Sequence, residues 1–346
     1  MNSPHLVTIA GGGLAGLTLG IALRQHSVPV TIWEAGRYPR HRVCGEFICG
    51  RGRETLASLG LNEILSQAGA REAKTAAFFA GKPTSPVRPL PEAALCLSRF
   101  SLDESLANHF RALGGELHEG KRWSDSMQQD GVVQATGRRP QAKPGGWRWF
   151  GLKAHARNVE LAADLEVHLS PIGYIGLCRL SDDIVNVCGL FRRRDEAGSV
   201  PPRTEMLRGT PGSALHERLA NAKFVTGSIC AVGGLDLRPN HDLAAHECRI
   251  GDALTMIPPF TGNGMSMAFE AAGLAAGPLE RWSRGKSSWV ETVQTVASGC
   301  NEAFRNRLKW SRRLHRLMFI GPLQPFIVRW LPSSKGSWNF LFSRTR

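Results

Sequence analysis

A glycine-rich turn between an apolar strand and an apolar helix constrains the fold of this chain more than any other feature. Residues 5–10 have the pattern of a buried strand, the turn carries Gly11, Gly13 and Gly16, and the helix that follows runs to about Gln25. A second strand, residues 28–33, ends at Glu34. The first glycine permits the tight turn, the second lets backbone approach a diphosphate, and the third lets helix and strand pack closely. The pattern predicts a dinucleotide-binding βαβ unit.

A second glycine-containing segment lies more than 200 residues downstream and opens another helix. It begins at Gly251-Asp252 and continues through residues 258–266, which read Pro-Pro-Phe-Thr-Gly-Asn-Gly-Met-Ser. A plain NAD dehydrogenase has no need of such an element, whereas the longer FAD molecule must be held at both ends. We therefore expect Asp252 to bind the ribityl hydroxyls and the helix near Gly264 to direct its positive end at flavin N1 and C2=O. A simple turn is the alternative interpretation of Gly251-Asp252.

Together with Ala135-Thr136-Gly137, the two segments resemble the fold of para-hydroxybenzoate hydroxylase. Within that fold, the run from Arg42 to Glu46 (Arg-Val-Cys-Gly-Glu) is similar to the Arg/Lys-x-Cys-Gly-Glu segment of the geranylgeranyl reductase-like branch. Arg99 with Asp103 resembles the helix entry of the same branch. The likeness extends from residue 1 to about 285. It implies non-covalent FAD, reduction by NADH or NADPH, and a hydrophobic or aromatic substrate that reaches the isoalloxazine from an antiparallel sheet.

The expected cofactor contacts come from these segments and from the residues that carry the resemblance. They are Gly11, Gly13, Leu14, Ala15, Gly16, Glu34, Ala35, Arg42, Cys44, Gly45, Arg99, Ala135, Thr136, Gly137, Gly251, Asp252, Pro259, Gly262, Asn263, Gly264 and Met265. The nicotinamide site is not readable from the sequence. Arg138 and Arg139 are candidates for its phosphates, and solvated turn residues are the alternative.

The remaining pattern predicts an α/β fold: a Rossmann-type FAD-binding lobe, an interleaved antiparallel-sheet substrate lobe and a helical C-terminal tail. Helix and strand patterns alternate early in the chain, which favours a mainly parallel sheet. Residues 160–169, 172–180 and 184–191 then alternate with period two, as in an antiparallel meander. We assign residues 1–80, 97–150 and 225–285 to the FAD-binding lobe, 81–96 and 151–224 to the substrate lobe, and 286–346 to the basic tail.

The substrate side of the site is less sharply defined by the sequence. We expect the cavity wall to include Glu46, Trp147, Trp149, Tyr174 and Phe260. Cys44 is the candidate catalytic residue, because the matching cysteine of the related reductases lies near the flavin and a thiol of ordinary pKa can donate a proton at neutral pH. Inert packing is the alternative for this cysteine, and core packing is the alternative for the tryptophans. No spacing of histidines or cysteines indicates a metal site.

Four activities are compatible with these motifs. The cysteine segment and the lack of an Asp-Gly motif after residue 137 favour C=C reduction of an isoprenoid-, polyketide- or phenol-like molecule. A flavin monooxygenase acting on an aromatic or polyketide substrate is the main alternative. A flavin-dependent halogenase is a minor alternative and would use Lys74 as its reactive lysine; an ordinary surface lysine is the other interpretation of this residue. Residues 147–152 resemble the Trp-x-Trp-x-Ile-Pro motif of such halogenases but lack its Ile-Pro. The fourth is an FAD-binding electron-relay protein without substrate chemistry.

The strong positive charge of the chain is concentrated in its tail. The formal net charge is +14, yet the first 304 residues carry 33 basic and 29 acidic groups, and no acidic residue follows Glu302. The tail is a candidate for peripheral contact with an anionic membrane, the alternative being a helix packed on the body. Nucleic-acid binding is not expected. The eight scattered cysteines favour a reduced, cytoplasmic protein, with peripheral association at the inner membrane face as an option.

Overall fold

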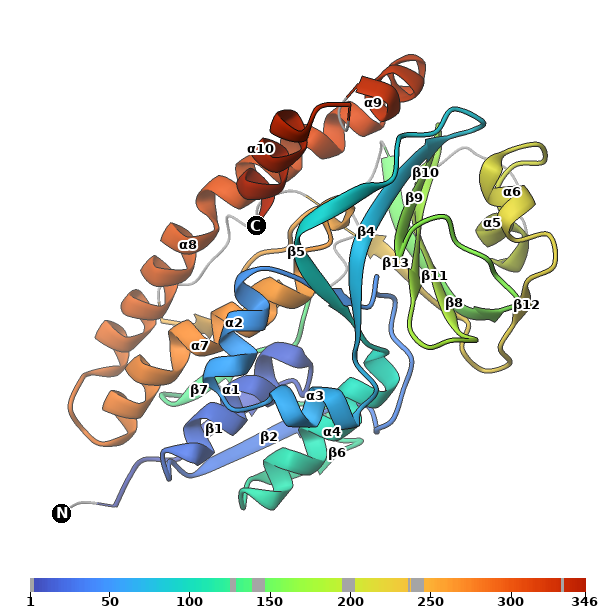
Figure 1. Cartoon of the computed structure of the whole chain (residues 1–346). Helices are drawn as coiled ribbons and strands as arrows, with labels where there is room; N and C mark the ends of the chain where they lie inside the picture. Colours follow the sequence, from blue (N-terminus) through green and yellow to red (C-terminus); the bar gives the residue numbers. More distant parts are fainter. Residues whose placement is uncertain are drawn as a thin grey trace.

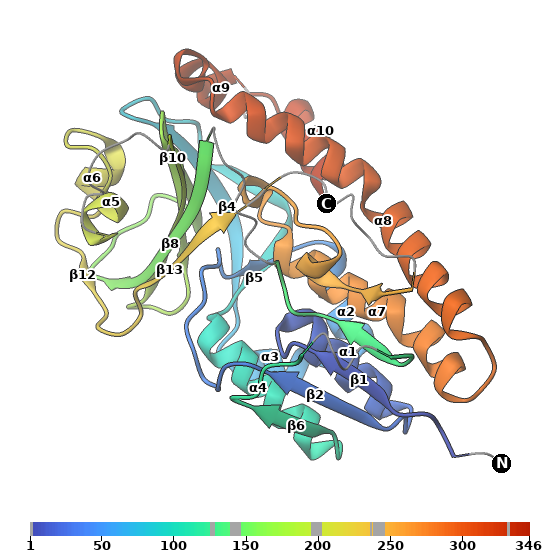
Figure 2. The same ribbon diagram turned by 180° about the vertical axis from the view of Figure 1, so that it is seen from behind.

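The computed structural model describes residues 3–124, 129–138, 147–194, 203–235, 237, 246–330 and 333–346. Two lobes lie side by side, and a long helix runs along one flank of both (Figures 1 and 2). One lobe is built on a parallel sheet and the other on a larger, mostly antiparallel sheet. The predicted fold class, including the helical tail, is confirmed.

The first lobe is a five-stranded parallel sheet in the order β14-β7-β1-β2-β6. Its strands are β1 (Val7–Ala10), β2 (Val30–Glu34), β6 (Glu116–Glu119), β7 (Val132–Gln134) and β14 (Cys248–Arg249). Helix α1 (Leu14–Gln25) joins β1 to β2, as predicted, and ten of its residues are buried. It packs against α7 (Gly264–Ser283) and α4 (Arg99–Ala112), so the first glycine turn stands on the central strand of a closely packed layer.

The second sheet has the order β12-β8-β11-β10-β9-β4-β5-β3, with β13 paired to β8. Its strands are β3 (Phe47–Ile48), β4 (Arg71–Ala80), β5 (Arg88–Cys96), β8 (Trp147–Arg157), β9 (Leu165–Ser170), β10 (Gly173–Arg179), β11 (Val185–Arg194), β12 (Lys223–Phe224) and β13 (Cys230–Leu235). The predicted meander is confirmed as β9-β10-β11. The pairing of β4 with β9 is parallel, so the sheet is mixed.

The membership of this sheet differs from the sequence-based assignment in four strands. The assignment places β3, β4, the first four residues of β8 and the strand near residues 228–232 in the FAD-binding lobe, but all of these pair within the second sheet. The inward face of β8 carries Lys153 and His155, which are buried and paired. The sequence analysis predicts no strand over β8, because charged and polar residues such as these are not expected on a buried strand face.

The remaining helices connect the lobes or form the tail. They are α2 (Arg51–Ser58), α3 (Asn62–Gln67), α5 (Arg203–Arg208), α6 (Ala214–Arg218), α8 (Trp289–Met318), α9 (Gln324–Trp330) and α10 (Lys335–Thr345), with short 3₁₀ turns at Gly251–Ala253, Pro259–Thr261 and Gly321–Leu323. None of the helices within the described ranges is long and apolar enough to cross a bilayer.

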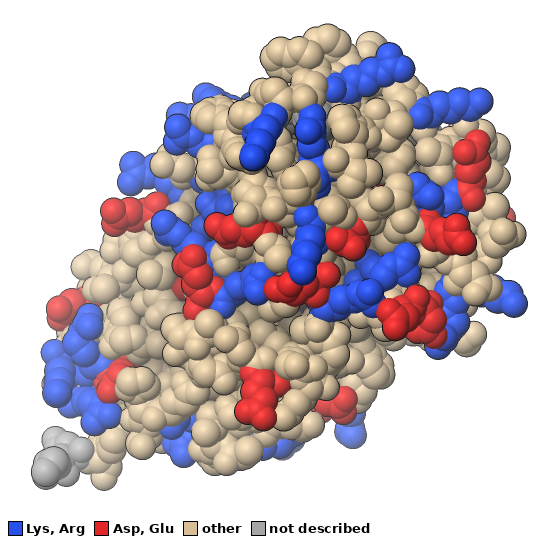
Figure 3. All heavy atoms as spheres, viewed as in Figure 1, with Lys and Arg blue, Asp and Glu red and all other residues tan. Residues whose placement is uncertain are grey.

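The tail packs on the body of the protein along α8. Arg307 in this helix donates to both carboxylate oxygens of Glu270 in α7, at 2.6 and 3.0 Å, and both side chains are buried. Farther along, Leu314 and Met318 are also buried. Over the upper end of the tail helices, Figure 3 shows tan and blue surface and no red. The tail therefore covers the lobe of the second sheet with one side and keeps a basic outer surface.

Candidate functional site

The first glycine turn is closed on its inner side and open on its outer side. Gly11 has φ +111°, and a Cβ at this position would collide with the carbonyl of Ala135. A Cβ at Gly16 would collide with the Gly11 carbonyl, whereas one at Gly13 would meet no atom within 4 Å. Gly13 precedes the first residue of α1, so the open side lies at a helix N-terminus. This arrangement fits a diphosphate held by backbone N–H groups.

Glu34 is anchored in its ionised form at the end of β2. One carboxylate oxygen accepts from the Gly12 N–H at 2.9 Å, and the other accepts from the Gly36 N–H at 2.7 Å and from Arg40 at 2.5 Å. Burial alone would raise the pKa of Glu34, but these bonds and the positive charges of Arg40 and Arg42 lower it. A fixed carboxylate at this point fits the hydroxyls of an adenosine ribose. Arg40 is a contact that the sequence reasoning missed.

The late Gly-Asp segment lies directly beside the first turn. Strand β14 pairs with β7, and the Ile250 N–H donates to the Gln134 carbonyl at 3.0 Å. A Cβ at Gly251 would lie 2.9 Å from the Cβ of Ala15. The Ala135 N–H donates to the Ala10 carbonyl at 2.7 Å, which joins the residues 135–137 to the same cluster. The three predicted segments are therefore brought together by the parallel sheet.

Asp252 presents an unpaired carboxylate at this junction. The residue is open to solvent, and within the described part of the chain its carboxylate accepts no hydrogen bond. The protein around it is dense enough that burial raises its pKa, although the charges of Arg138 and Arg99 act in the opposite direction. An acceptor of this kind fits the hydroxyl donors of a ribityl chain. Arg139 lies outside the described residues.

The segment before α7 forms a left-handed turn against the Arg42–Cys49 region. Gly262 has φ +66°, and the ring of Phe47 occupies the space where its Cβ would be. Ser266 accepts from the Cys49 N–H at 3.2 Å and donates to the Cys49 carbonyl at 2.7 Å. A Cβ at Gly264 would meet nothing within 4 Å. The start of α7 is thus partly open, which fits a flavin ring beside a helix N-terminus.

Other predicted residues of this segment are structural or contact the tail. Met265 is buried in the core of the FAD-binding lobe, and Pro259 begins the 3₁₀ turn. Asn263 is buried and donates to the carbonyl of Thr345. Arg346 donates to the Thr261 carbonyl at 2.6 Å. The end of the described chain is therefore tied to the loop that precedes α7.

An ion-pair chain connects the cysteine segment with the ribose end. Arg99 donates to both oxygens of Asp103, at 2.6 and 2.8 Å, and Arg42 lies 3.3 Å from Asp103 and 3.5 Å from Glu34. Cys44 lies beside Arg99, and burial raises the pKa of its thiol despite that positive neighbour. The Cys44 thiol is therefore protonated at neutral pH, the form that can donate a proton.

Glu46, which we expect in the cavity wall, is buried in an ion-pair cluster between the two lobes. Its side chain is fully buried, with φ +58°, and it joins the two lobes. One oxygen accepts from Lys153 at 3.0 Å and from the Arg99 N–H at 2.8 Å, and the other lies 2.7 Å from Nε2 of His155. Burial alone would raise the pKa of Glu46, but the His155 bond and the Lys153 charge lower it. The residue holds β8 against the FAD-binding lobe.

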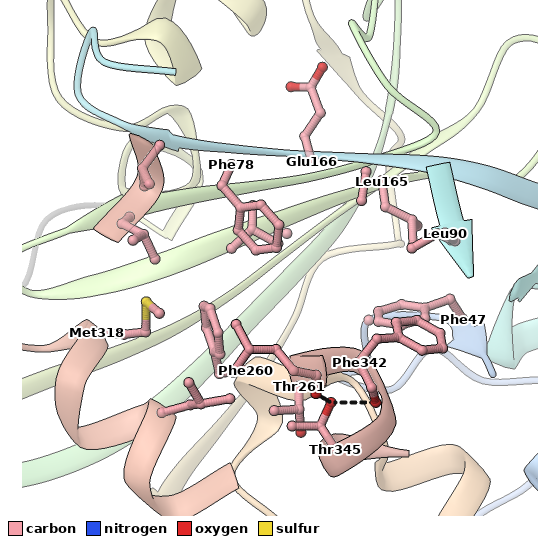
Figure 4. Close-up of a pocket in the computed structure, with 18 of the residues that line it drawn as sticks. Phe47, Phe78, Leu90, Leu165, Glu166, Phe260, Thr261, Met318, Phe342 and Thr345 are labelled. Atoms are coloured by element: carbon pink, nitrogen blue, oxygen red, sulfur yellow. Dashed lines mark hydrogen bonds between the residues drawn. The ribbon is translucent and has the colours of Figure 1, made fainter. Parts of the chain in front are cut away.

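An apolar cavity of about 140 Å³ lies between the second sheet and the tail (Figure 4). Phe78, Leu90 and Leu165 reach into it from the sheet, Phe260 and Phe47 from the segments around the expected flavin site, and Met318 and Phe342 from the tail. Gly45 and Thr261 complete its boundary with the FAD-binding lobe. Glu166 points away from the cavity and pairs with His168 at 2.8 Å on the other face of the sheet.

The predicted aromatic residues of the cavity fall into different places. Phe260 lines it, and Tyr174 packs edge-on against Phe260 with ring centroids 5.4 Å apart. Trp147 is 45% exposed and lines a separate groove, where Arg192 and Arg194 stack on its ring. Trp149 packs against His315 and Phe319 of the tail. The two tryptophans are therefore not part of this cavity, because they stand at the start of β8, outside it.

The tail residues of the cavity were not predicted, because nothing in a helical pattern indicates which distant surface it covers. Trp338 and Phe342 of α10 and Ile327 and Val328 of α9 line the cavity with α8.

Lys74, the lysine that a halogenase would use, has a 72% exposed side chain and pairs with Glu72 at 3.5 Å. It is the surface lysine of the alternative interpretation, outside the cavity.

The comparisons with known proteins agree with this geometry. Residues 5–145 match the family model described as FAD binding domain. No curated protein has a sequence significantly similar to the chain. Among solved structures, the flavin-dependent brominase Bmp2 is similar with a TM-score of 0.77 and 18% identity, over 99% of this chain and 93% of that chain.

Two further structures share the fold. Halogenase PltM in complex with phloroglucinol and FAD has a TM-score of 0.72 and 14% identity, over 99% of this chain and 86% of that chain. PqsL of P. aeruginosa in complex with 2-aminobenzoylacetate has a TM-score of 0.69 and 15% identity, over 94% of this chain and 99% of that chain. At these identities the likeness establishes the fold, and the geranylgeranyl reductase-like branch stays a prediction. Residues 5–145 thus match an FAD binding domain, and the chain as a whole has the fold of these three structures.

Proposed function

We propose that this protein is an FAD-dependent oxidoreductase that reduces a C=C bond of a hydrophobic small molecule, with NADH or NADPH as the reductant. The observation that carries the proposal is the apolar cavity, which begins at Gly45 and Phe260–Thr261, beside the segments that fit the flavin end of FAD. Its walls are mostly aliphatic and phenyl side chains, so it suits a molecule without charge. An isoprenoid, polyketide or phenol-like compound has this character.

Reduced FAD, when bound, supplies a hydride equivalent, and the remaining requirement is a proton. Cys44 directly precedes Gly45 of the cavity wall, and the Asn186 amide donates to the Cys44 carbonyl at 3.0 Å, which fixes the segment. Because its thiol pKa is raised, Cys44 holds a proton that it can donate to the substrate carbon. The rings of Phe78, Phe260 and Phe342 exclude water and orient the apolar substrate.

The experiment is an anaerobic turnover assay with FAD-loaded protein. NADH and NADPH are tested separately for bleaching of the flavin absorbance, and candidate alkenes are then tested for reoxidation of the flavin with formation of the saturated product. In the Cys44→Ala variant we expect bleaching to persist and product formation to fall by roughly 10²-fold or more, the range for loss of a positioned acid. Cys300→Ala, a buried cysteine of α8, is the matched control.

A flavin monooxygenase is the second candidate, favoured by the phenyl rings of Phe47, Phe78, Phe260 and Phe342 in the cavity wall. Such rings suit the flat face of a phenolic substrate. The same protein, assayed in air with phenolic compounds, distinguishes the two: incorporation of labelled oxygen into product supports the monooxygenase, and saturated product without oxygen supports the reductase. Bromide or chloride in the aerobic assay tests halogenation. No bleaching by either nucleotide favours the electron-relay alternative.

A further inference from the structure

Helix α9 carries an exposed apolar patch at the end of the tail. Leu323, immediately before it, is 40% exposed, and Phe326 and Trp330 in the helix are 62% and 61% exposed. The three residues are spaced i, i+3 and i+7, so they share one side of the helix. The rings of Phe326 and Trp330 are stacked with centroids 6.0 Å apart. With Ile320, which is 46% exposed, they form what we call the apolar cap.

The opposite side of α9 is held in place by the body of the protein. Ile327 and Val328 are buried and line the substrate cavity. Gln324 is buried and donates to the carbonyls of Ser170, at 3.0 Å, and Met318, at 2.7 Å. One short helix therefore presents apolar residues both inward to the cavity and outward to the surroundings. The cap is a fixed part of the surface next to the cavity.

The charges around the cap are all positive along the tail. Arg313 and Arg316 on α8 and Arg329 on α9 are exposed, and no acidic residue occurs in the chain after Glu302. Figure 3 shows basic side chains beside the tan surface at the upper end of the molecule. A protein partner would need a matching acidic surface, whereas an anionic lipid headgroup layer above hydrocarbon matches both the charge and the apolar cap at once.

We propose that the apolar cap inserts into the surface of an anionic lipid bilayer while Arg313, Arg316 and Arg329 contact lipid phosphates. Trp and Phe at the boundary between headgroups and hydrocarbon, flanked by basic residues, are typical of interfacial helices. The protein docks on the membrane without crossing it, since no helix of the described chain could span one. As a consequence that rests on the proposed function, an apolar substrate enters the cavity from the lipid past α9.

The test is flotation of the purified full chain with vesicles of phosphatidylcholine alone and of phosphatidylcholine mixed with phosphatidylglycerol. We expect binding to the anionic vesicles, little binding to the neutral ones, and release at high salt. The double variant Phe326→Ser/Trp330→Ser should lose binding by about tenfold or more, because two large apolar side chains no longer leave water. Val290→Ser, 52% exposed at the start of α8, is the matched apolar control.

Charge is tested separately with Arg316→Glu/Arg329→Glu against the control Arg51→Glu, an exposed arginine of α2. The first variant should lose anionic-vesicle binding and the control should keep it. Trp330 fluorescence, taken as the difference from Trp330→Phe, should shift to the blue on vesicle addition. Each readout is independent of turnover, so it stands or fails separately from the reductase assay.

Wild-type protein that does not float with anionic vesicles would overturn the proposal, as would a Phe326→Ser/Trp330→Ser variant that binds like the wild type. A second copy of this chain is the competing occupant of the cap. It would be identified by a dimer in sedimentation analysis that the same double variant dissociates, without vesicle binding, and that result also contradicts the proposal.

Discussion

Nζ of Lys153 lies 3.0 Å from Oε1 of Glu46, and neither side chain has any exposed surface. The two residues come from distant parts of the chain, since Glu46 ends the cysteine segment and Lys153 lies on β8 of the second sheet. Nδ1 of His41 lies 3.1 Å from the same ammonium group. This pair therefore sets how the substrate sheet sits against the segment that precedes the cavity.

Glu46→Gln should lower the free energy of unfolding by about 3–5 kcal/mol, because it leaves the Lys153 charge buried without a counter-ion. Urea denaturation of the purified protein measures the change. Glu72→Gln, an exposed partner of surface ion pairs, should change it by less than about 1 kcal/mol. The double variant Glu46→Gln/Lys153→Met should regain part of the loss. Equal stability of Glu46→Gln and wild type would contradict the assignment.

Asp252→Asn should make the protein without cofactor more stable and its FAD affinity lower. Burial raises the pKa of Asp252, so its negative charge lowers the stability of the cofactor-free protein at neutral pH. Hydroxyl donors of bound FAD would offset this cost by hydrogen bonding to the carboxylate. Loss of hydrogen bonds to a charged acceptor should weaken FAD binding by roughly tenfold to a hundredfold. Thermal unfolding with and without FAD measures both effects. The exposed Asp130→Asn is the control, and a variant that loses stability in both states would contradict this role.

Acid should destabilise the protein from about pH 6.5 downward, partly through His315. Burial, and the charge of Arg192, lower the pKa of His315 to about 4. Between these two values the unfolded chain binds a proton that the folded chain does not, so stability falls as the pH falls. His315→Phe should flatten the curve of unfolding free energy against pH in this window. An unchanged slope in the variant would show that His315 is not the source.

Ala76→Phe should block the substrate cavity without affecting the cofactor. Ala76 lies on β4 and lines the cavity, so a phenyl ring there occupies space that the substrate needs. We expect KM for a turned-over substrate to rise about tenfold or more, with an unchanged flavin spectrum. Ala57→Phe, on the exposed side of α2, is the control. Turnover of Ala76→Phe at the wild-type KM would mean that substrates bind elsewhere.

The sequence predicted the parts of this protein that depend on local pattern. The strand, glycine turn and helix around Gly11 to Gly16 follow one another directly, and the meander of β9 to β11 shows regular alternation. The Gly251-Asp252 segment was identified by its chemistry, and its position beside Ala15 follows from the pairing of β14 with β7.

What the sequence could not provide were contacts between distant elements. Trp147 and Trp149 have the composition of a binding wall, but the register of β8 against β11 carries them away from the cavity. Glu46 and Lys153 are 107 residues apart, and only the folded sheet shows that they pair. The tail helices close the cavity because Arg307 and Glu270 hold α8 on α7, a relationship that no periodicity encodes.

FAD binding by a pair of glycine variants is the most direct test of the account. A Cβ at Gly13 meets no protein atom within 4 Å, so we expect Gly13→Val to fold normally and to fill the space of the diphosphate. Gly277→Val, a position in α7 that is equally open, is the control. Titration with FAD, followed by flavin absorbance after gel filtration, should give a yellow complex for the wild type and Gly277→Val and none for Gly13→Val. A wild-type protein that remains colourless, or a Gly13→Val variant that binds FAD as tightly as the wild type, would contradict the account.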